Sequence, residues 1–262
     1  LTQTPYSDLM DKSYLSPHGL NDVVGVVVVT IIFYRIGRNV LYRVPDGVNL
    51  FLSKKIFVTR TIKFYFPMTA LLIGWLPYLV LYYPGFILGD SVSSIEQALG
   101  NWGLGNHHPV IYTIFIRICI RIGLMYGNLA LGVAIYSILQ MLFVSFALAK
   151  SIEWLSRHKC PCIVSCIITG CFVLMPFFGE TSIAMWKDPL FGASTVLWTL
   201  SLLDYMESSP EKEKHQNLLA VFITSLLVCF TRNNGIYSLI FSLLVIAVEC
   251  IRHYTNFKKQ YY

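Results

Sequence analysis

The chain has 262 residues, of which 55% are hydrophobic and 13% are charged, and its formal net charge is +6. Soluble domains carry about 25% charged residues, so this composition excludes an ordinary water-soluble protein and predicts an integral membrane protein. The Lys and Arg residues form no continuous basic face outside the loops, which argues against a nucleic-acid partner.

Apolar runs predict the membrane-spanning helices in chain order, because ~20 mostly apolar residues cross the hydrocarbon core of a bilayer. The predicted spans are residues 20–36, 64–83, 129–149, 161–179, 189–206, 218–231 and 236–251. We therefore expect an all-α polytopic membrane protein with about seven transmembrane helices. The first residue is Leu1 and no signal-peptide pattern follows it, so a fragment of a longer protein is one expectation for this chain.

Lys and Arg residues indicate how these spans are oriented, because cytoplasmic loops carry an excess of both. The segment 35–63 carries seven of them, so we place it in the cytoplasm and the next loop, 84–128, outside. Within that loop lies a further apolar run, 110–124. If this run does not span, the later cytoplasmic loops hold eight cations and the outer loops two, whereas a spanning run reverses the ratio. We therefore expect it to lie on the outer surface.

The first half of the outer loop predicts an amphipathic helix that lies on the membrane. Apolar side chains recur there at spacings of three and four residues, and polar side chains share the opposite flank. The apolar side holds Val92, Ile95 and Leu99, and the polar flank holds Ser91, Ser94 and Gln97. Asp90 stands at the start of this helix.

A glycine-rich turn, residues 100–106, leads into a second amphipathic surface helix over 110–124. Thr113, Arg117 and Arg121 recur every four residues and form one polar stripe on an otherwise apolar helix. Two arginines facing lipid in the middle of a bilayer would be costly. A helix lying flat at the outer interface places them among headgroups or towards a cavity.

These elements divide the chain into three parts. Residues 1–63 form an N-terminal segment with one short transmembrane helix and a basic cytoplasmic loop. Residues 64–251 form the main transmembrane module, which contains the outer loop 84–128. Residues 252–262 form a basic cytoplasmic tail.

Three polar clusters fall on the outer side under this topology. They are Asp90 with Glu96, His107 and His108; Glu180 with Lys187 and Asp188; and Arg232 with Asn233 and Asn234. Cations hold a phosphate through charge-assisted hydrogen bonds, and a carboxylate beside them can accept the proton of an attacking hydroxyl. Such side chains at one membrane face suit an anionic substrate that is attached to a lipid.

Each cluster also has a purely structural interpretation. Asp90 and Asp188 can act as helix N-caps, because a carboxylate there accepts hydrogen bonds from free backbone N–H groups. Lys187 and Arg232 can simply extend their charged groups to lipid headgroups. The paired histidines of the outer loop can lie at the interface without a role in chemistry.

The outer loop carries Gly89-Asp90-Ser91 early and the segment HHPVIY, residues 107–112, late. This pattern resembles the first outer loop of polytopic GT-C glycosyltransferases, the class that includes protein O-mannosyltransferases and the aminoarabinose transferases of lipid A. The motifs WKDP (186–189) and TRNNG (231–235) resemble those of an uncharacterised bacterial family of GT-C-like membrane proteins. The resemblance covers residues 64–251. It departs from the class at Ser91, where a second acidic residue is usual, and in the short length of the chain.

The resemblance implies a GT-C-like fold and the transfer of a sugar from a polyprenyl-phosphate carrier to an acceptor at the outer face of the cell membrane. Asp90 would be the catalytic carboxylate, which takes the proton of the acceptor or helps to hold a divalent metal. Lys187 and Arg232 would bind the lipid phosphate and stabilise its charge as it leaves. The full set of substrate-binding residues would be Glu96, His107, His108, Lys187, Asp188, Arg232, Asn233 and Asn234. Neither the donor sugar nor the acceptor is implied.

Two other classes of function remain as alternatives. A lipid or polysaccharide transporter, such as a flippase, would place charged residues inside the spans near the bilayer centre. A non-catalytic membrane subunit would use the outer loop to bind a partner protein. The spans predicted here are almost free of charge, which favours chemistry at the membrane face over passage through it.

Overall fold

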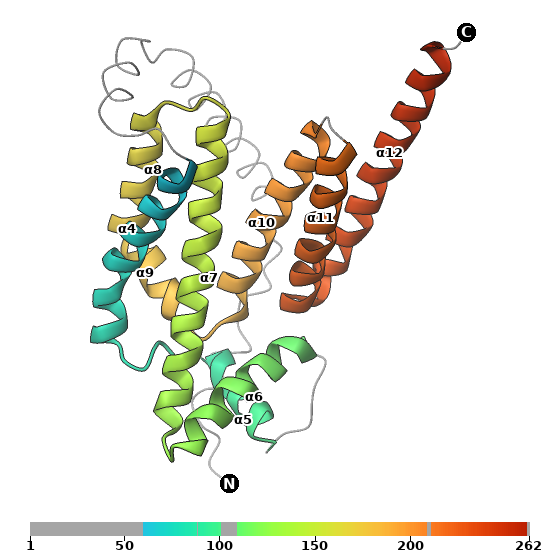
Figure 1. The fold of residues 1–262 in the computed structure, drawn as a ribbon. Coiled ribbons are helices and arrows are strands. Elements are labelled where there is room, and N and C mark those ends of the chain that lie inside the picture. Colours follow the sequence, from blue (N-terminus) through green and yellow to red (C-terminus); the bar gives the residue numbers. More distant parts are fainter. Residues whose placement is uncertain (1–59, 88, 101–108, 209–210, 261–262) are drawn as a thin grey trace, which may run out of the picture. The chain divides into compact units, whose positions relative to one another are not determined.

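The computed structural model describes residues 60–87, 89–100, 109–208 and 211–260 of the chain (Figure 1). The chain divides into two units, Leu1–Leu52 and Ser53–Tyr262, and the described residues all belong to the second. They form nine α-helices and one 3-10 turn. In chain order these are α4 (Arg60–Leu81), α5 (Gly89–Leu99), α6 (Val110–Met125), α7 (Leu129–Arg157), α8 (Cys162–Leu174), α9 (Pro176–Ile183), α10 (Lys187–Glu207), α11 (Glu211–Thr231), η1 (Asn233–Gly235) and α12 (Ile236–Gln260). The predicted span 20–36 lies outside the described residues.

The helices confirm the all-α membrane class. Four segments are long and apolar enough to cross a bilayer, namely Lys63–Leu81, Leu129–Arg157, Glu213–Thr231 and Asn233–Ile251. The bent pair α8–α9 makes a fifth if it crosses as one unit. α10 has the length of a span, but its ends carry charged residues and its middle carries several hydroxyl side chains, so it is not among them. The prediction of about seven spans is thus borne out in part.

The predicted continuous span 161–179 is broken in the structure, because α8 ends at Leu174 and α9 begins at Pro176 after a bend of 61°. Proline has no backbone N–H, so Pro176 leaves the carbonyl four residues earlier, that of Phe172, without its helical donor. The indole of Trp75 on α4 donates to this carbonyl oxygen at 3.0 Å. A fully buried tryptophan therefore satisfies the backbone group that the proline frees.

α7 is the central helix of this unit, in contact with α4, α6, α8, α9 and α10. In its apolar window 44% of the residues are buried, against 11% in that of α12. At 29 residues it is ~43 Å long, more than the ~30 Å hydrocarbon core requires. It therefore continues past the predicted end at residue 149 into a polar last stretch, where Lys150 and the buried Glu153 form an ion pair of 2.8 Å.

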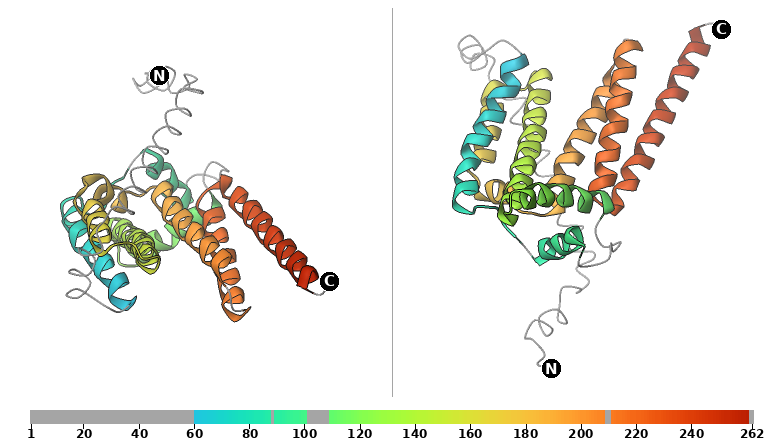
Figure 2. Two further views of the ribbon diagram at one scale, coloured as in Figure 1. Left: turned by 90° about the horizontal axis from the view of Figure 1, so that it is seen from above. Right: turned by 60° about the horizontal axis from the view of Figure 1, so that its bottom comes forward.

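α6 crosses the ends of the long helices (Figure 2), and it packs on the first turns of α7 through two glycines. A β-carbon added to Gly123 would lie 2.6 Å from the Cα of Gly132, and one added to Gly132 would lie 2.8 Å from the Cα of Ile120. Real side chains do not approach backbone atoms this closely. The two helix backbones are therefore in direct contact, and glycine is required on both sides of the crossing.

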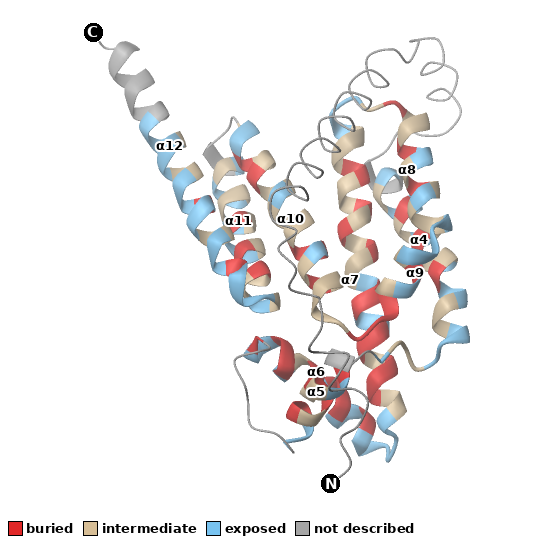
Figure 3. Ribbon diagram, turned by 180° about the vertical axis from the view of Figure 1, so that it is seen from behind, coloured by how far each residue is buried: buried red, intermediate tan, exposed pale blue. Residues whose placement is uncertain are grey.

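α5 buries its polar flank, and both α5 and α6 expose apolar side chains. In α5, Ser91, Ser94 and Gln97 are buried, whereas Val92 and Leu99 are exposed. α6 exposes a stripe of aliphatic side chains, comprising Val110, Ile111, Ile114, Ile118 and Ile122. Buried residues gather on α5, α6 and the adjoining part of α7 (Figure 3). Helices whose outward face is apolar suit a surrounding of lipid rather than water.

The side chains of the predicted polar stripe of α6 make contacts that differ from the expected ones. Thr113 is buried, and Arg117 turns towards α5, where its Nε donates to the carbonyl of Ala98 at 2.9 Å and its Nη2 to that of Gln97 at 3.0 Å. These are among the last carbonyls of α5, which have no donor within their own helix. Arg117 thus caps α5, and Arg121 is the exposed arginine of the pair.

A set of polar contacts joins the last turns of α7 and α10. Trp154 Nε1 donates to Asp204 Oδ1 at 2.9 Å, and Arg157 Nη2 donates to Asp204 Oδ2 at 3.1 Å. His158 stacks on Trp154 with 3.8 Å between ring centroids, and its Nε2 lies 2.6 Å from Glu207 Oε2. These contacts hold α7 and α10 together at their C-terminal ends.

His158 should bind its proton more tightly than an ordinary histidine. Its Nδ1 lies 2.8 Å from the carbonyl oxygen of Trp154, and this contact and then Glu207 raise the pKa of His158 above the usual 6.5. Because the pKa of His158 is higher in the folded than in the unfolded protein, its protonation stabilises the fold. This contribution to the free energy of unfolding is complete below the pKa of the unfolded state and is lost as the pH rises through the pKa of the folded state. We expect NMR titration to give a raised pKa that falls in Glu207→Gln and is unchanged in Glu213→Gln. Equal values in the wild type and Glu207→Gln would contradict this.

Candidate functional site

The site is built around the short link of residues 184–186 between α9 and α10. Phe86, in the loop after α4, pairs with this link: Met185 N donates to the Phe86 carbonyl at 2.9 Å, and Phe86 N donates to the Ile183 carbonyl at 3.3 Å. From α5, the Ser91 hydroxyl donates to the Met185 carbonyl. Phe86 and the start of α5 are therefore fixed, through hydrogen bonds to backbone groups, to the segment that leads into Lys187 and Asp188.

Gln140, in the middle of α7, holds the same link from the other side. Its Nε2 lies 2.6 Å from the carbonyl oxygen of Ala184, 3.1 Å from that of Ser182 and 3.2 Å from that of Thr181. The last carbonyls of a helix lack intrahelical donors, so Gln140 caps the end of α9. The Tyr136 hydroxyl donates to Gln140 Oε1 at 2.8 Å. A fully buried amide inside a candidate span thereby orients the entry to α10.

Asp188 and Arg232, which are 44 positions apart in sequence, form an ion pair. Arg232 Nη1 lies 3.5 Å from Asp188 Oδ1, and the guanidinium also lies over the ring of Phe191, 5.2 Å from its centroid. Charge-assisted hydrogen bonds are usually ~2.7–2.9 Å long, so this pair is loose. Asp188 Oδ1 is buried and accepts no hydrogen bond from a described residue.

Arg232 retains binding capacity for an anion. A guanidinium has five N–H donors, and Arg232 makes no hydrogen bond through them to any part of the chain that the structure describes. Its side chain is 45% exposed. Asp188 lies in the first turn of α10, where the helix dipole favours negative charge. The N-cap of α10 is Trp186, so the interpretation of Asp188 as an N-cap is wrong.

The remaining predicted residues of these two clusters lie close by in sequence but differ in setting. Lys187 is the first residue of α10 and is half-buried. Asn233 and Asn234 belong to η1 and are exposed. Glu180 is exposed on α9, before the link. The structure thus brings the second and third predicted clusters together through Asp188 and Arg232.

The first predicted cluster is described only in part. Asp90 lies in the first turn of α5, and Glu96 is half-buried on the same helix. The side chain of Asp90 and all of His107 and His108 lie outside the described residues. The contact of Ser91 with Met185 places the start of α5 beside the link, two residues before Lys187.

A divalent metal stays a prediction. Within residues whose side chains are described, no three His, Cys, Asp or Glu side chains converge on a possible metal position. Asp90, which would help to hold the metal, and the predicted site residues His107 and His108 are not among the residues searched. In the motif HKCPC, residues 158–162, His158 contacts Glu207, and burial raises the pKa of the Cys160 thiol.

Sequence reasoning missed the residues that hold the link. Gln140 carried a signal, because a polar side chain in the middle of an apolar run needs partners inside the membrane. Tyr136 and Ser91 carried none, since tyrosine and serine are ordinary at such positions. Tyr136 donates to the side chain of Gln140 and Ser91 to a backbone carbonyl, and no residue type reveals either partner.

More than half of the chain matches the sequence model of a protein family. Residues 100–258, more than half of the chain, match a family described as a family of unknown function (DUF6020). The matched range contains Asp188 and Arg232, whereas Asp90 and Glu96 precede it. No curated protein and no solved structure matches the chain.

Proposed function

The chain belongs to the DUF6020 family, and we propose that it is a membrane glycosyltransferase that moves a sugar from a polyprenyl-phosphate carrier to an acceptor at the extracytoplasmic face. The observation that carries the proposal is the loose Asp188–Arg232 pair at the start of α10. It combines a cation, whose donors make no hydrogen bond to the described residues, with a carboxylate, at the end of the helical bundle where α5 and α6 gather.

The first helical turn of α10 adds to the attraction for a phosphate. Backbone N–H groups at a helix N-terminus are free to bind an anion, and the helix dipole favours negative charge there. Lys187 stands at this N-terminus, and Arg232 approaches it from η1. A lipid phosphate held by these groups would replace the long contact between Arg232 and Asp188 with shorter charge-assisted bonds.

The reaction breaks the bond between the sugar C1 and the phosphate oxygen and forms a bond between C1 and the acceptor hydroxyl. The electron pair leaves with the polyprenyl phosphate, whose growing charge Arg232 and Lys187 stabilise. The acceptor proton passes to a carboxylate, the role we assign to Asp90. Glu96, His107, His108, Asn233 and Asn234 complete the substrate site in this proposal, and Asp188 holds Arg232 until the phosphate binds.

The proposed placement in the membrane follows from the exposed apolar faces. α5 and α6 lie at the outer interface, with the aliphatic stripe of α6 towards lipid. α10 counts as a further span because it packs between α7 and α11. With residues 20–36 this makes about seven spans, a multi-pass protein of the cell membrane whose site faces outwards.

The polar interior of the described helices supports a transferase better than a transporter. The buried polar side chains in the middle of α7 are uncharged, namely Ser137, Gln140 and Ser145. The buried carboxylate of α7, Glu153, lies near the end of the helix and is paired with Lys150. A charged pathway through the bilayer centre would need ionisable groups where these neutral ones stand.

Binding of a polyprenyl-phosphate sugar to the nanodisc-held protein tests the proposal. We expect the wild type to bind, and Lys187→Ala and Arg232→Ala each to weaken binding by about tenfold or more, since hydrogen bonds to charged groups contribute ~1.5–3 kcal/mol. Arg157→Ala is the matched control, because Arg157 forms a similar ion pair with Asp204 at the other end of α10. Absence of binding, or equal loss in the control, would reject the phosphate site.

A further inference from the structure

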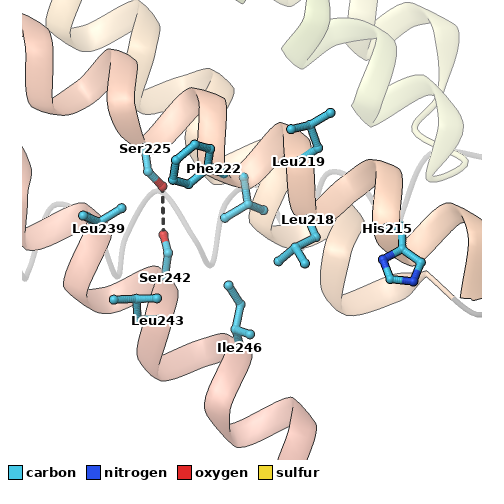
Figure 4. A pocket seen from close by; sticks show the side chains of 10 residues that line it. His215, Leu218, Leu219, Phe222, Ser225, Leu239, Ser242, Leu243 and Ile246 are labelled. Carbon is cyan, nitrogen blue, oxygen red and sulfur yellow. Dashed lines mark hydrogen bonds between the residues drawn. The ribbon is translucent and has the colours of Figure 1, made fainter.

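A groove of about 470 Å³ runs between α11 and α12 (Figure 4), and neither Asp188 nor Arg232 lines it. Seven apolar side chains of the two helices line it, together with the imidazole of His215 and the hydroxyls of Ser225 and Ser242. His215 lies at one end of the row and the two serines lie towards the other (Figure 4). The lining is therefore almost wholly hydrocarbon with one polar end.

The groove arises because the two helices touch near η1 and then separate (Figure 1). Gly235 has no side chain, and a β-carbon there would lie 2.7 Å from the Cα of Cys229, so the helix backbones meet closely at this end. The hydroxyls of Ser225 and Ser242, 3.1 Å apart, form the next contact. Beyond them the space between the helices widens.

The two serines offer nothing to a polar ligand. Both are buried, and Ser242 Oγ accepts a hydrogen bond from Trp198 Nε1 at 2.8 Å and donates one to the Ser238 carbonyl at 2.8 Å. Their hydrogen bonds are thus made within the protein. A polar group in the groove would lose its own hydrogen bonds without replacement, so the walls select a hydrocarbon chain.

The size of the groove matches one alkyl chain better than a whole helix. The lining runs along α11 from His215 to Ser225, which is ~15 Å of helix. A helix segment of that length, about 10 Å across, would occupy roughly 1,000 Å³. The groove is about half as large, which suits a single alkyl chain.

The polar end of the groove lies at the membrane face opposite the proposed site. His215 and Arg232 are 17 residues apart on α11 and its cap, or ~25 Å along the helix, close to the ~30 Å thickness of the hydrocarbon core. A carrier lipid whose phosphate lies at Arg232 belongs to the leaflet on the Arg232 side of the membrane. The occupant whose headgroup lies at His215 must belong to the opposite leaflet.

We propose that this groove binds one acyl chain of a phospholipid from the leaflet opposite the Asp188–Arg232 pair, with the lipid phosphate accepting a hydrogen bond from His215. The bound chain fills a gap that would otherwise stay empty between α11 and α12. It thereby supports the packing of α12, whose other faces are largely exposed. This site is independent of the proposed transferase activity.

Photolabelling of the full chain in nanodiscs, with phosphatidylglycerol that carries a diazirine on one acyl chain, tests this site. Leu243 and Leu244 are neighbours on α12 with exposed fractions of 59% and 60%, but Leu243 lines the groove and Leu244 does not. We expect label on the groove residues, a loss of about fivefold or more in Leu243→Trp, and no change in Leu244→Trp. Label spread evenly over exposed apolar residues, or an equal effect of both variants, would overturn the proposal.

The headgroup contact is tested with His215→Ala and two probes. We expect this variant to weaken groove labelling by phosphatidylglycerol and to leave labelling by a diacylglycerol of the same chains unchanged, because that probe has no phosphate. Unlabelled polyprenyl phosphate should not compete. Competition by it would assign the groove to the carrier lipid and overturn the proposal, and equal effects on both probes would remove His215 from the site.

Discussion

Gly123→Ala should destabilise the folded protein by about 3 kcal/mol, a large effect for the addition of one methyl group. The new β-carbon would lie 2.6 Å from Gly132 Cα and 2.7 Å from the Asn128 carbonyl oxygen. Both are backbone atoms, which cannot rotate away as a side chain can. α6 must therefore separate from α7, and α5 with it, because Arg117 on α6 binds the last carbonyls of α5.

Unfolding in mixed micelles by increasing SDS, followed by circular dichroism, measures this loss. Gly192→Ala is the matched control, since Gly192 also lies within a helix but a β-carbon there would meet no atom within 4 Å. Alanine has the higher helix propensity, so this control should stabilise α10 by up to ~1 kcal/mol. If Gly123→Ala behaved like Gly192→Ala, the close crossing of α6 and α7 would be wrong.

Apolar length and amphipathic spacing were enough to predict most of the described helices, but they did not determine how each helix ends. The run 161–179 reads as one span by length, yet Pro176 divides it. Pro176 itself indicated a break in the helix, because proline has no backbone N–H. What the sequence does not reveal is that Trp75, on another helix, satisfies the carbonyl that the break exposes.

The candidate site depends on contacts between distant segments, which sequence patterns specify poorly. Asp188 and Arg232 could each be recognised as charged residues beside a membrane helix, but their pairing follows from the packing of α10 on α11. The role of Arg117 shows the same limit. Its spacing predicted a polar stripe towards headgroups or a cavity, whereas the approach of α5 gives it helix carbonyls to bind.

Asp188→Asn should strengthen binding of a polyprenyl-phosphate sugar by about three- to tenfold, the opposite sign from Arg232→Ala. In the wild type, the carboxylate of Asp188 competes with the ligand phosphate for the same guanidinium. Asparagine keeps the size of the side chain but removes its charge, so Arg232 can form all its charge-assisted bonds with the phosphate. A tenfold change corresponds to ~1.4 kcal/mol, which a single charge can supply at a half-exposed site.

The double variant Asp188→Asn with Arg232→Ala separates this mechanism from a general change in the site. We expect it to bind as weakly as Arg232→Ala alone, because the gain from removing Asp188 passes through Arg232. Asp204→Asn is the matched control, since it frees Arg157 in the same way at the far end of α10 and should leave binding unchanged. If Asp188→Asn weakened binding as much as Arg232→Ala, Asp188 would be a direct ligand of the substrate rather than a competitor for Arg232. If it left binding unchanged, the ion pair would only hold η1 on α10, and the phosphate would have to bind elsewhere.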